Sequence, residues 1–368
     1  MNKYFSVDAM KKILIALTAL VMCVSLCACA QRETEEPATD AVSLWCTADS
    51  PEARALGALT DEYNALPDRA ATVSLKIFPS ESAMAEAFNS LRPDLLACTY
   101  DRASSLAAGG QLSAVPGLEE TLGEKLNGGL AAFAGGSFIP VGGEAPLLLC
   151  APGAPVPETP EELAGAAAET EGRSLAVTQW ADIFAAAACA SGEEFYCELE
   201  RDAGNGSFAE LYNLFAELAY EGKMSFSPRA AELAAAGKLR YALVSSAELS
   251  GVDIGGCTLC AMPDMYGDKS QFMSSVWGVA VTGGTGKSAR GAADFTAWLL
   301  DGSRLGDAAL RCGLMPAAAC TDRSTALCAA LFDISRTHRL YTAEAGSPYY
   351  TLRHGFNEEV TAAMERLY

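Results

Sequence analysis

The segment 137–151 constrains the fold more than any other stretch, because it places a carboxylate between two apolar runs. The runs 138–141 and 146–150 have the length and composition of β-strands. The residues between them are small apart from Glu144, which suits a bend or a close backbone approach. A carboxylate in such surroundings is rarely buried without a partner. Two interpretations stay open: the chain leaves one lobe here and enters a second, with Glu144 facing the cleft between them, or the segment is a surface hairpin.

An alternation of strands and helices precedes this segment. Two apolar runs, 42–46 and 95–99, and a segment of alternating apolar residues, 73–77, predict strands. Helical spacing of apolar residues between these runs predicts two helices, and this β-α-β-α-β order predicts a parallel sheet covered by helices. Ligands of such sheets bind beyond the carboxyl ends of the strands. We therefore expect five side chains to share one rim: Trp45, Asp49, Tyr100, Asp101 and Arg102.

The chain after residue 151 predicts a second α/β unit. Three further runs predict strands: 174–178, 241–244 and 257–262. A later strand, 275–282, contains Trp277, and Trp180 follows the end of the strand at 174–178. Because both tryptophans lie at or near a predicted strand end or lobe crossing, we include them among the candidate ligand-binding residues.

The first 28 residues have the three parts of an export signal. Two lysines at positions 11 and 12 precede an apolar run at 13–26, and small residues follow. The sequence Leu-Cys-Ala-Cys at 26–29 resembles the lipobox of bacterial lipoproteins, in which cleavage precedes the cysteine that is lipidated. We expect removal of residues 1–28, lipid on Cys29 and attachment to the outer face of the cytoplasmic membrane. Residues 29–41 are polar and aperiodic, which predicts a flexible tether.

The composition bears on partners and cofactors. A formal net charge of -20 at pH 7 repels phosphate groups, which argues against nucleic acid as a ligand. The 13 cysteines are too few per residue for a disulfide-built scaffold. Local disulfides are predicted between Cys189 and Cys197 and between Cys312 and Cys320. The Cys-x-x-Cys motif at 257–260 stands alone, so structural disulfides or buried thiols are favoured over a redox or zinc centre, and we predict no metal and no cofactor.

Several motifs occur in an order that resembles the extracellular solute-binding proteins of ABC importers, in particular the sugar-binding family that includes maltodextrin-binding protein. The resemblance spans roughly residues 42–368. The matching segments are Pro93-Asp94 before a strand, Asp101-Arg102 after it, AAGGQL at 107–112, Ile139-Pro140-Val141 with Glu144, TPEEL at 159–163, Gly237-Lys238 before a strand, and GLMPA at 313–317.

The resemblance implies a two-lobe, type II periplasmic-binding-protein-like α/β fold. Each lobe would be a mostly parallel sheet flanked by helices, and the lobes would be joined by hinge crossings. The implied N-terminal lobe comprises residues 42–141 plus 277–315, and the implied C-terminal lobe comprises residues 146–273 plus 318–368. Ligand would bind between the lobes and close them by a hinge motion.

The resemblance also implies a function. The protein would be a monomeric, lipid-anchored receptor that is not an enzyme and that delivers a sugar or oligosaccharide to ABC permease subunits. The implied sugar contacts are Asp49, Asp101, Arg102, Glu144 and Tyr349. Two aromatic positions of the family fall at Cys98 and near Ser245, where this chain has none, which speaks against a maltodextrin. A cleft of carboxylates and aromatics would also suit a polyamine or another cation, and an exported hydrolase or a sensor module remain as alternatives.

Overall fold

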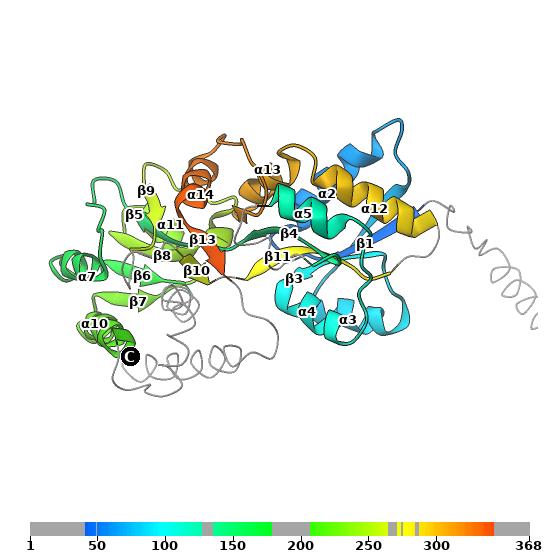
Figure 1. The fold of residues 1–368 in the computed structure, drawn as a ribbon. Helices are drawn as coiled ribbons and strands as arrows, with labels where there is room; N and C mark the ends of the chain where they lie inside the picture. Colours follow the sequence, from blue (N-terminus) through cyan, green and yellow to red (C-terminus); the bar gives the residue numbers. More distant parts are fainter. Residues whose placement is uncertain are drawn as a thin grey trace, which may run out of the picture.

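The computed structural model describes residues 41–48, 50–126, 135–178, 207–263, 271–273, 275–283 and 287–341. These residues form two larger β-sheets flanked by helices, and the chain runs between the two sheets more than once (Figure 1). This is the α/β architecture expected from the alternation of strands and helices in the sequence.

The first sheet has six strands in the order β12-β4-β11-β3-β1-β2. Its strands are β1 (Ala41–Thr47), β2 (Thr72–Phe78), β3 (Leu95–Thr99), β4 (Phe138–Gly143), β11 (Val276–Val281) and β12 (Met315–Pro316). Strand β1 pairs in parallel with both β2 and β3, whereas β11 runs antiparallel between β3 and β4. The sheet is therefore mixed, because a late strand of the chain is inserted among the early ones.

Helices cover both faces of the first sheet. Helices α2 (Ala53–Asn64), α12 (Lys287–Leu299) and α13 (Arg304–Arg311) lie on one side, together with α5 (Leu118–Lys125), and α3 (Glu81–Ser90) and α4 (Tyr100–Ala108) lie on the other (Figure 1). Burial on both faces explains why β1 is mostly apolar, since Val42, Leu44 and Cys46 are fully buried and Trp45 between them is also buried.

The second sheet has five strands in the order β7-β6-β8-β5-β9. Its strands are β5 (Pro146–Cys150), β6 (Leu175–Val177), β7 (Met224–Phe226), β8 (Tyr241–Ser245) and β9 (Thr258–Ala261). Alternate residues of β5 enter two different cores: Leu147 and Leu149 join the main apolar cluster, whereas Leu148 and Cys150 join a second cluster. The second cluster packs under α7 (Pro160–Ala168) and α10 (Ser207–Tyr220), and the helix α11 (Ala230–Ala235) belongs to the main cluster.

The crossing from the first sheet to the second is very short. Strand β4 ends at Gly143 and β5 begins at Pro146, so only Glu144 and Ala145 separate the two sheets. The chain returns to the first sheet at β11, and α14 (Ala326–Thr337) contacts both β12 of the first sheet and β9 of the second. A separate two-stranded sheet pairs β10 (Gln271–Met273) with β13 (Arg339–Tyr341).

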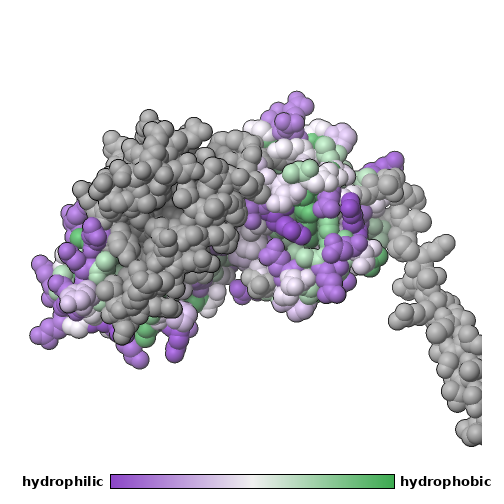
Figure 2. All heavy atoms as spheres, turned by 90° about the horizontal axis from the view of Figure 1, so that it is seen from below, coloured by the Kyte–Doolittle hydropathy of each residue, from purple (hydrophilic) through white to green (hydrophobic). Residues whose placement is uncertain are grey.

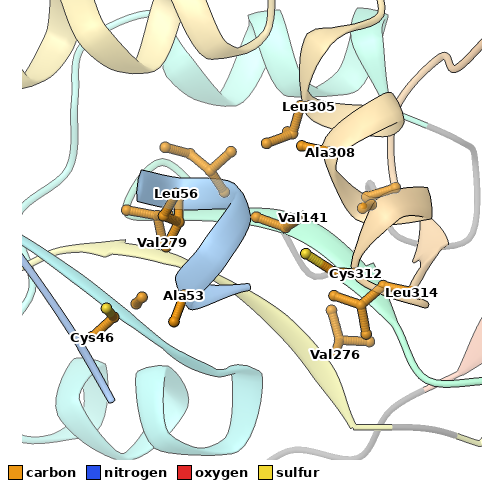
Figure 3. Close-up of a cluster of buried hydrophobic side chains, with 14 of the residues drawn as sticks. Cys46, Ala53, Leu56, Val141, Val276, Val279, Leu305, Ala308, Cys312 and Leu314 are labelled. Atoms are coloured by element: carbon orange, nitrogen blue, oxygen red, sulfur yellow. The ribbon is translucent and has the colours of Figure 1, made fainter. Parts of the chain in front are cut away.

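One apolar cluster extends across both sheets. Figure 3 shows part of it, where Cys312 and Leu314 beyond the end of α13 lie beside Val141 of β4 and Val276 of β11. Two glycines permit the close packing. A Cβ atom on Gly142 would lie 2.5 Å from the Met315 carbonyl oxygen. Gly313 has a φ of 75°, and a Cβ atom there would collide with the carbonyl oxygen of Ser246, the first residue of the 3₁₀ helix η2 (Ser246–Leu249) that follows β8.

The predicted disulfide between Cys312 and Cys320 is wrong, because both thiols are free. Cys312 is the C-cap residue of α13 and is buried in the core. Strand β12 lies between Cys312 and Cys320 in the sequence. The predicted partner pair of Cys189 and Cys197 lies outside the described residues.

On the surface in Figure 2, hydrophilic side chains predominate among the coloured atoms and hydrophobic ones are interspersed. Within the described ranges, no helix combines the length and apolarity that a membrane span requires.

Candidate ligand-binding site at the crossing between the sheets

The carboxylate of Glu144 accepts hydrogen bonds from both sheets. The Ser245 hydroxyl, at the end of β8 in the second sheet, donates to Glu144 Oε2 at 2.6 Å. The Trp277 indole nitrogen, on β11 of the first sheet, donates to Glu144 Oε1 at 3.1 Å. All three side chains are half-buried. Of the two interpretations of segment 137–151, the structure therefore supports the crossing and not the surface hairpin.

Backbone and side-chain hydrogen bonds hold the crossing in place. The Ala145 amide donates to Ser246 Oγ at 2.8 Å, and the Ser246 amide donates back to the Ala145 carbonyl oxygen at 2.8 Å. The Glu144 amide donates to the Ser275 carbonyl oxygen at 3.3 Å. Because backbone groups on both sides of the Glu144 side chain are bonded, its carboxylate has a defined position and direction.

Strand pairing brings Trp277 to the same end of the first sheet as the start of α4. Trp277 lies opposite Thr99, the last residue of β3, on one side and Gly142 on the other. Tyr100 is the first residue of α4 and follows Thr99 directly. The Tyr100 ring makes an edge contact with Phe138, with ring centroids 5.5 Å apart. The predicted site residues Tyr100 and Trp277 are therefore neighbours in the folded chain.

Asp101 and Arg102 occupy the first turn of α4 and are half-buried. An acidic residue is favourable there, because the helix dipole is positive at its N-terminus. Their place in the sequence puts both residues beside Tyr100, at the carboxyl end of β3. Tyr100, Asp101 and Arg102 are the part of the expected rim that the structure brings together, and the pairing of Trp277 with Thr99 places Trp277 at the same end of the sheet.

Trp45 lies elsewhere. Its side chain is 5 % exposed, its ring centroid is 4.8 Å from that of Phe78, and the Lys76 ammonium nitrogen is 4.9 Å from its ring centroid. Trp45 pairs with Leu96, whereas Trp277 pairs with Thr99. Successive residues of a strand point to opposite faces, and positions 96 and 99 have opposite parity. Trp45 and Trp277 therefore project from opposite faces of the first sheet.

The two positions that lack the family's aromatic residues, Ser245 and Cys98, have different roles in the structure. Ser245 was considered only as a position that lacks an aromatic residue, yet its hydroxyl is the partner of Glu144. Its place at the end of a predicted strand was the one available signal. Cys98, the other position without an aromatic, is buried inside β3, and burial holds the pKa of its thiol far above the ordinary value. Cys98 is a neutral packing residue.

Four predicted residues lie outside the described part of the chain: Cys29, Asp49, Trp180 and Tyr349. Within the described part, no group of three or more His, Cys, Asp or Glu side chains could hold a metal ion. A carboxylate between an indole nitrogen and a hydroxyl offers acceptor atoms and an aromatic face, which are the groups that bind hydroxyl-rich or cationic solutes.

Two mixed sheets flanked by helices, with a two-residue crossing from β4 to β5, define the two-lobe fold of the solute-binding proteins of ABC importers, and solved structures agree. The cyclic α-maltosyl-1,6-maltose binding protein of Arthrobacter globiformis has a TM-score of 0.68 at 16% identity, covering 89% of this chain and 94% of that chain. The galacto-N-biose-/lacto-N-biose I-binding protein of a Bifidobacterium longum ABC transporter has a TM-score of 0.65 at 15% identity, covering 89% and 92%.

A polyamine receptor has the same fold. PotD, the spermidine/putrescine ABC transporter substrate-binding protein of Streptococcus pneumoniae, has a TM-score of 0.62 at 11% identity, covering 89% of this chain and 99% of that chain. No protein-family model matches the chain, and no curated protein sequence matches it.

Proposed function

We propose that this protein is an extracellular solute receptor that captures a carbohydrate-like ligand between two lobes and delivers it to an ABC permease. The observation that carries the proposal is the Glu144 carboxylate at the crossing, which accepts hydrogen bonds from Ser245 of the second sheet and Trp277 of the first. A ligand that bonds to this carboxylate would touch a group that already receives hydrogen bonds from both sheets.

We assign residues 42–141 plus 277–315 to one lobe and residues 146–273 plus 318–368 to the other. Sheet membership supports this division, because β1 to β4, β11 and β12 form the first sheet and β5 to β9 form the second. The proposed ligand-binding residues are Glu144, Trp277, Tyr100, Asp101 and Arg102, joined by residues outside the described ranges. The protein acts by binding and hinge closure and not by catalysis.

The proposed location is the outer face of the cytoplasmic membrane, with lipid on Cys29 and a tether at 29–41. The test is substitution of Cys29 by serine, which should release the protein into the medium or leave it as an uncleaved precursor. Mass spectrometry of the wild-type protein should find a lipidated N-terminal Cys29, and an unmodified N-terminus at Ala30 or beyond would overturn the anchor.

A polyamine or another cationic solute is the second candidate ligand. Two observations favour it: the net charge of -20 attracts cations, and the polyamine receptor PotD shares the fold. A thermal-shift screen over mono- and oligosaccharides, polyamines and amino acids separates the two classes. Ligand at a hundred times its dissociation constant should stabilise the protein by about 2.7 kcal/mol.

Small-angle scattering with the best ligand of that screen tests the closure. We expect a smaller radius of gyration with ligand than without, because the lobes approach each other. An unchanged radius with a ligand whose affinity depends on Glu144 would contradict hinge closure. Stabilisation by no sugar and by no cation would contradict the receptor itself.

A further inference from the structure

Two cysteines of the second sheet lie together on one face. Cys150 is the last residue of β5 and is fully buried, and Cys260 lies on β9 and is half-buried. The pairing register sets Cys150 opposite Thr258 and Cys260 opposite Leu148, so the two cysteines are diagonal neighbours. Both belong to the apolar cluster under α7 and α10, which places their sulfur atoms on the same side of the sheet.

Both thiols are free in the structure, as Cys312 and Cys320 are, but unlike that pair they interact with each other. A hydrogen bond between the side chains raises the pKa of the Cys150 thiol and lowers the pKa of the Cys260 thiol. The Cys260 thiol also donates a hydrogen bond to the Leu148 carbonyl oxygen at 3.5 Å, which fixes its position on β9. Because Cys260 is half-buried and Cys150 is fully buried, Cys260 is the thiol that a solvent-borne oxidant reaches more readily.

We propose that Cys150 and Cys260 form a disulfide bond, and that Cys260 is the thiol that reacts first. The oxidant is a disulfide compound, either of low molecular weight or on a thiol-oxidising protein. The Cys260 thiolate attacks one sulfur of that disulfide and expels a thiolate, which takes up a proton. Cys150 then loses its proton to solvent and attacks the Cys260 sulfur, which expels the second external thiolate. Two protein thiols are oxidised, and one external disulfide is reduced to two thiols.

The neighbouring Cys257 does not compete for Cys260, although the Cys-x-x-Cys spacing suggests it. Cys257 packs against the main cluster, whereas Cys260 packs against the second cluster, so the two residues serve opposite faces of the second sheet. Burial also raises the pKa of the Cys257 thiol, which makes it the poorer nucleophile.

The position of β9 allows the bond to close. Diagonal neighbours on paired strands are separated by about 7–8 Å, slightly more than the span of a relaxed disulfide. Strand β9 is the last strand in the order of the second sheet and pairs there with β5 alone among the described strands. A shift of β9 relative to β5 breaks no pairing with another described strand, and it must be accommodated by α14, which also contacts β9. The bond would tie this edge strand to β5, the strand that carries the crossing.

Peptide mapping of the full-length chain tests the proposal without a ligand and without export, so its outcome is independent of the proposed function. The reduced, folded protein is incubated with oxidised glutathione, free thiols are blocked with iodoacetamide, and the protein is digested without reductant. We expect the peptides that contain Cys150 and Cys260 to become cross-linked, with Cys257 alkylated. A cross-link between Cys257 and Cys260, or separate alkylation of Cys150 and Cys260, would overturn the proposal.

Variants test the order of events. Cys150→Ala should accumulate glutathione on Cys260, because the resolving thiol is absent, whereas Cys260→Ala should leave Cys150 free of glutathione. Cys257→Ala is the matched control and should form the cross-link as the wild-type protein does. A Cys150→Ala protein that keeps native circular dichroism but shows no glutathione on Cys260 would overturn the assignment of Cys260 as the first nucleophile.

Discussion

The indole nitrogen of Trp277 donates a hydrogen bond to Glu144 across 133 residues of sequence, at 3.1 Å. An indole N–H only donates and an ionised carboxylate only accepts, so the direction of this bond is fixed. The second oxygen of the same carboxylate accepts from Ser245. The Glu144 carboxylate therefore contacts both sheets at once.

Substitution of Glu144 separates the two candidate ligand classes. A hydrogen bond to a charged group contributes about 1.5–3 kcal/mol, so Glu144→Ala should weaken ligand binding roughly ten- to a hundredfold. For a neutral sugar, Glu144→Gln keeps an acceptor oxygen and should lose less affinity. For a cation, Glu144→Gln should lose nearly as much as Glu144→Ala, and the loss should shrink in high salt. Calorimetric titration measures both, and wild-type affinity in Glu144→Ala would remove this residue from the site.

Substitution of Trp277 by phenylalanine removes the indole donor and keeps an aromatic ring. We expect the free energy of unfolding to fall by about 1 kcal/mol, the usual net contribution of one protein hydrogen bond. Part of this loss should be absent when Glu144 is already alanine, because the partner is then gone. Urea denaturation of the two single variants and the double variant measures this coupling. Strictly additive losses would mean that the bond does not contribute to stability.

Substitution of two glycines with similar φ angles tests the contact between the end of α13 and the second sheet. Gly313 has a φ of 75° and no room for a Cβ atom beside Ser246, whereas Gly302 has a φ of 69° and open space. Alanine at Gly302 should cost only the strain of a positive φ, about 1–2 kcal/mol. Alanine at Gly313 adds the collision, worth about 1–3 kcal/mol more. Equal losses in chemical denaturation would contradict a close contact at Ser246.

The Asp322 carboxylate makes the stability of the folded protein depend on pH. Its carboxylate accepts hydrogen bonds from Ser324 and from Arg311 Nε at 2.7 Å, which lowers its pKa from 3.8 to about 2. Because the folded pKa lies below the unfolded one, the stabilisation is complete above about pH 4 and is lost as the pH falls through 2. Asp322→Asn should therefore lower the melting temperature at pH 5 more than at pH 2.5. Asp333→Asn, in an exposed ion pair with Arg323, is the control and should change little at either pH.

Strands were the most predictable part of the fold. The run 95–99 predicted β3 with its observed bounds, and 42–46 and 73–77 fell one residue short of β1 and β2 at each end. Strand β3 lies between β1 and β11 and is buried on both faces, so its sequence is mostly apolar, whereas β2 at the edge alternates buried and exposed residues. The antiparallel insertion of β11 between β3 and β4 was not predictable, because no local pattern specifies a partner about 180 residues away along the chain.

The site was only partly predictable for the same reason. Glu144 stood out because a carboxylate between two strands is unusual, and the structure places it at the crossing. The burial of Trp45 depends on the register between β1 and β2, which sets Lys76 opposite it.

The two-residue crossing between β4 and β5 limits how such a chain can change in length. Both faces of β5 are buried, and its side chains alternate between two separate cores. An insertion of one residue between Gly143 and Pro146 would turn each side chain of β5 to the opposite face of the sheet. Leu147 and Leu149 would then face the second cluster, and Leu148 would face the main cluster. Homologous chains should therefore keep the length of this crossing, and insertions should collect in the turns far from it.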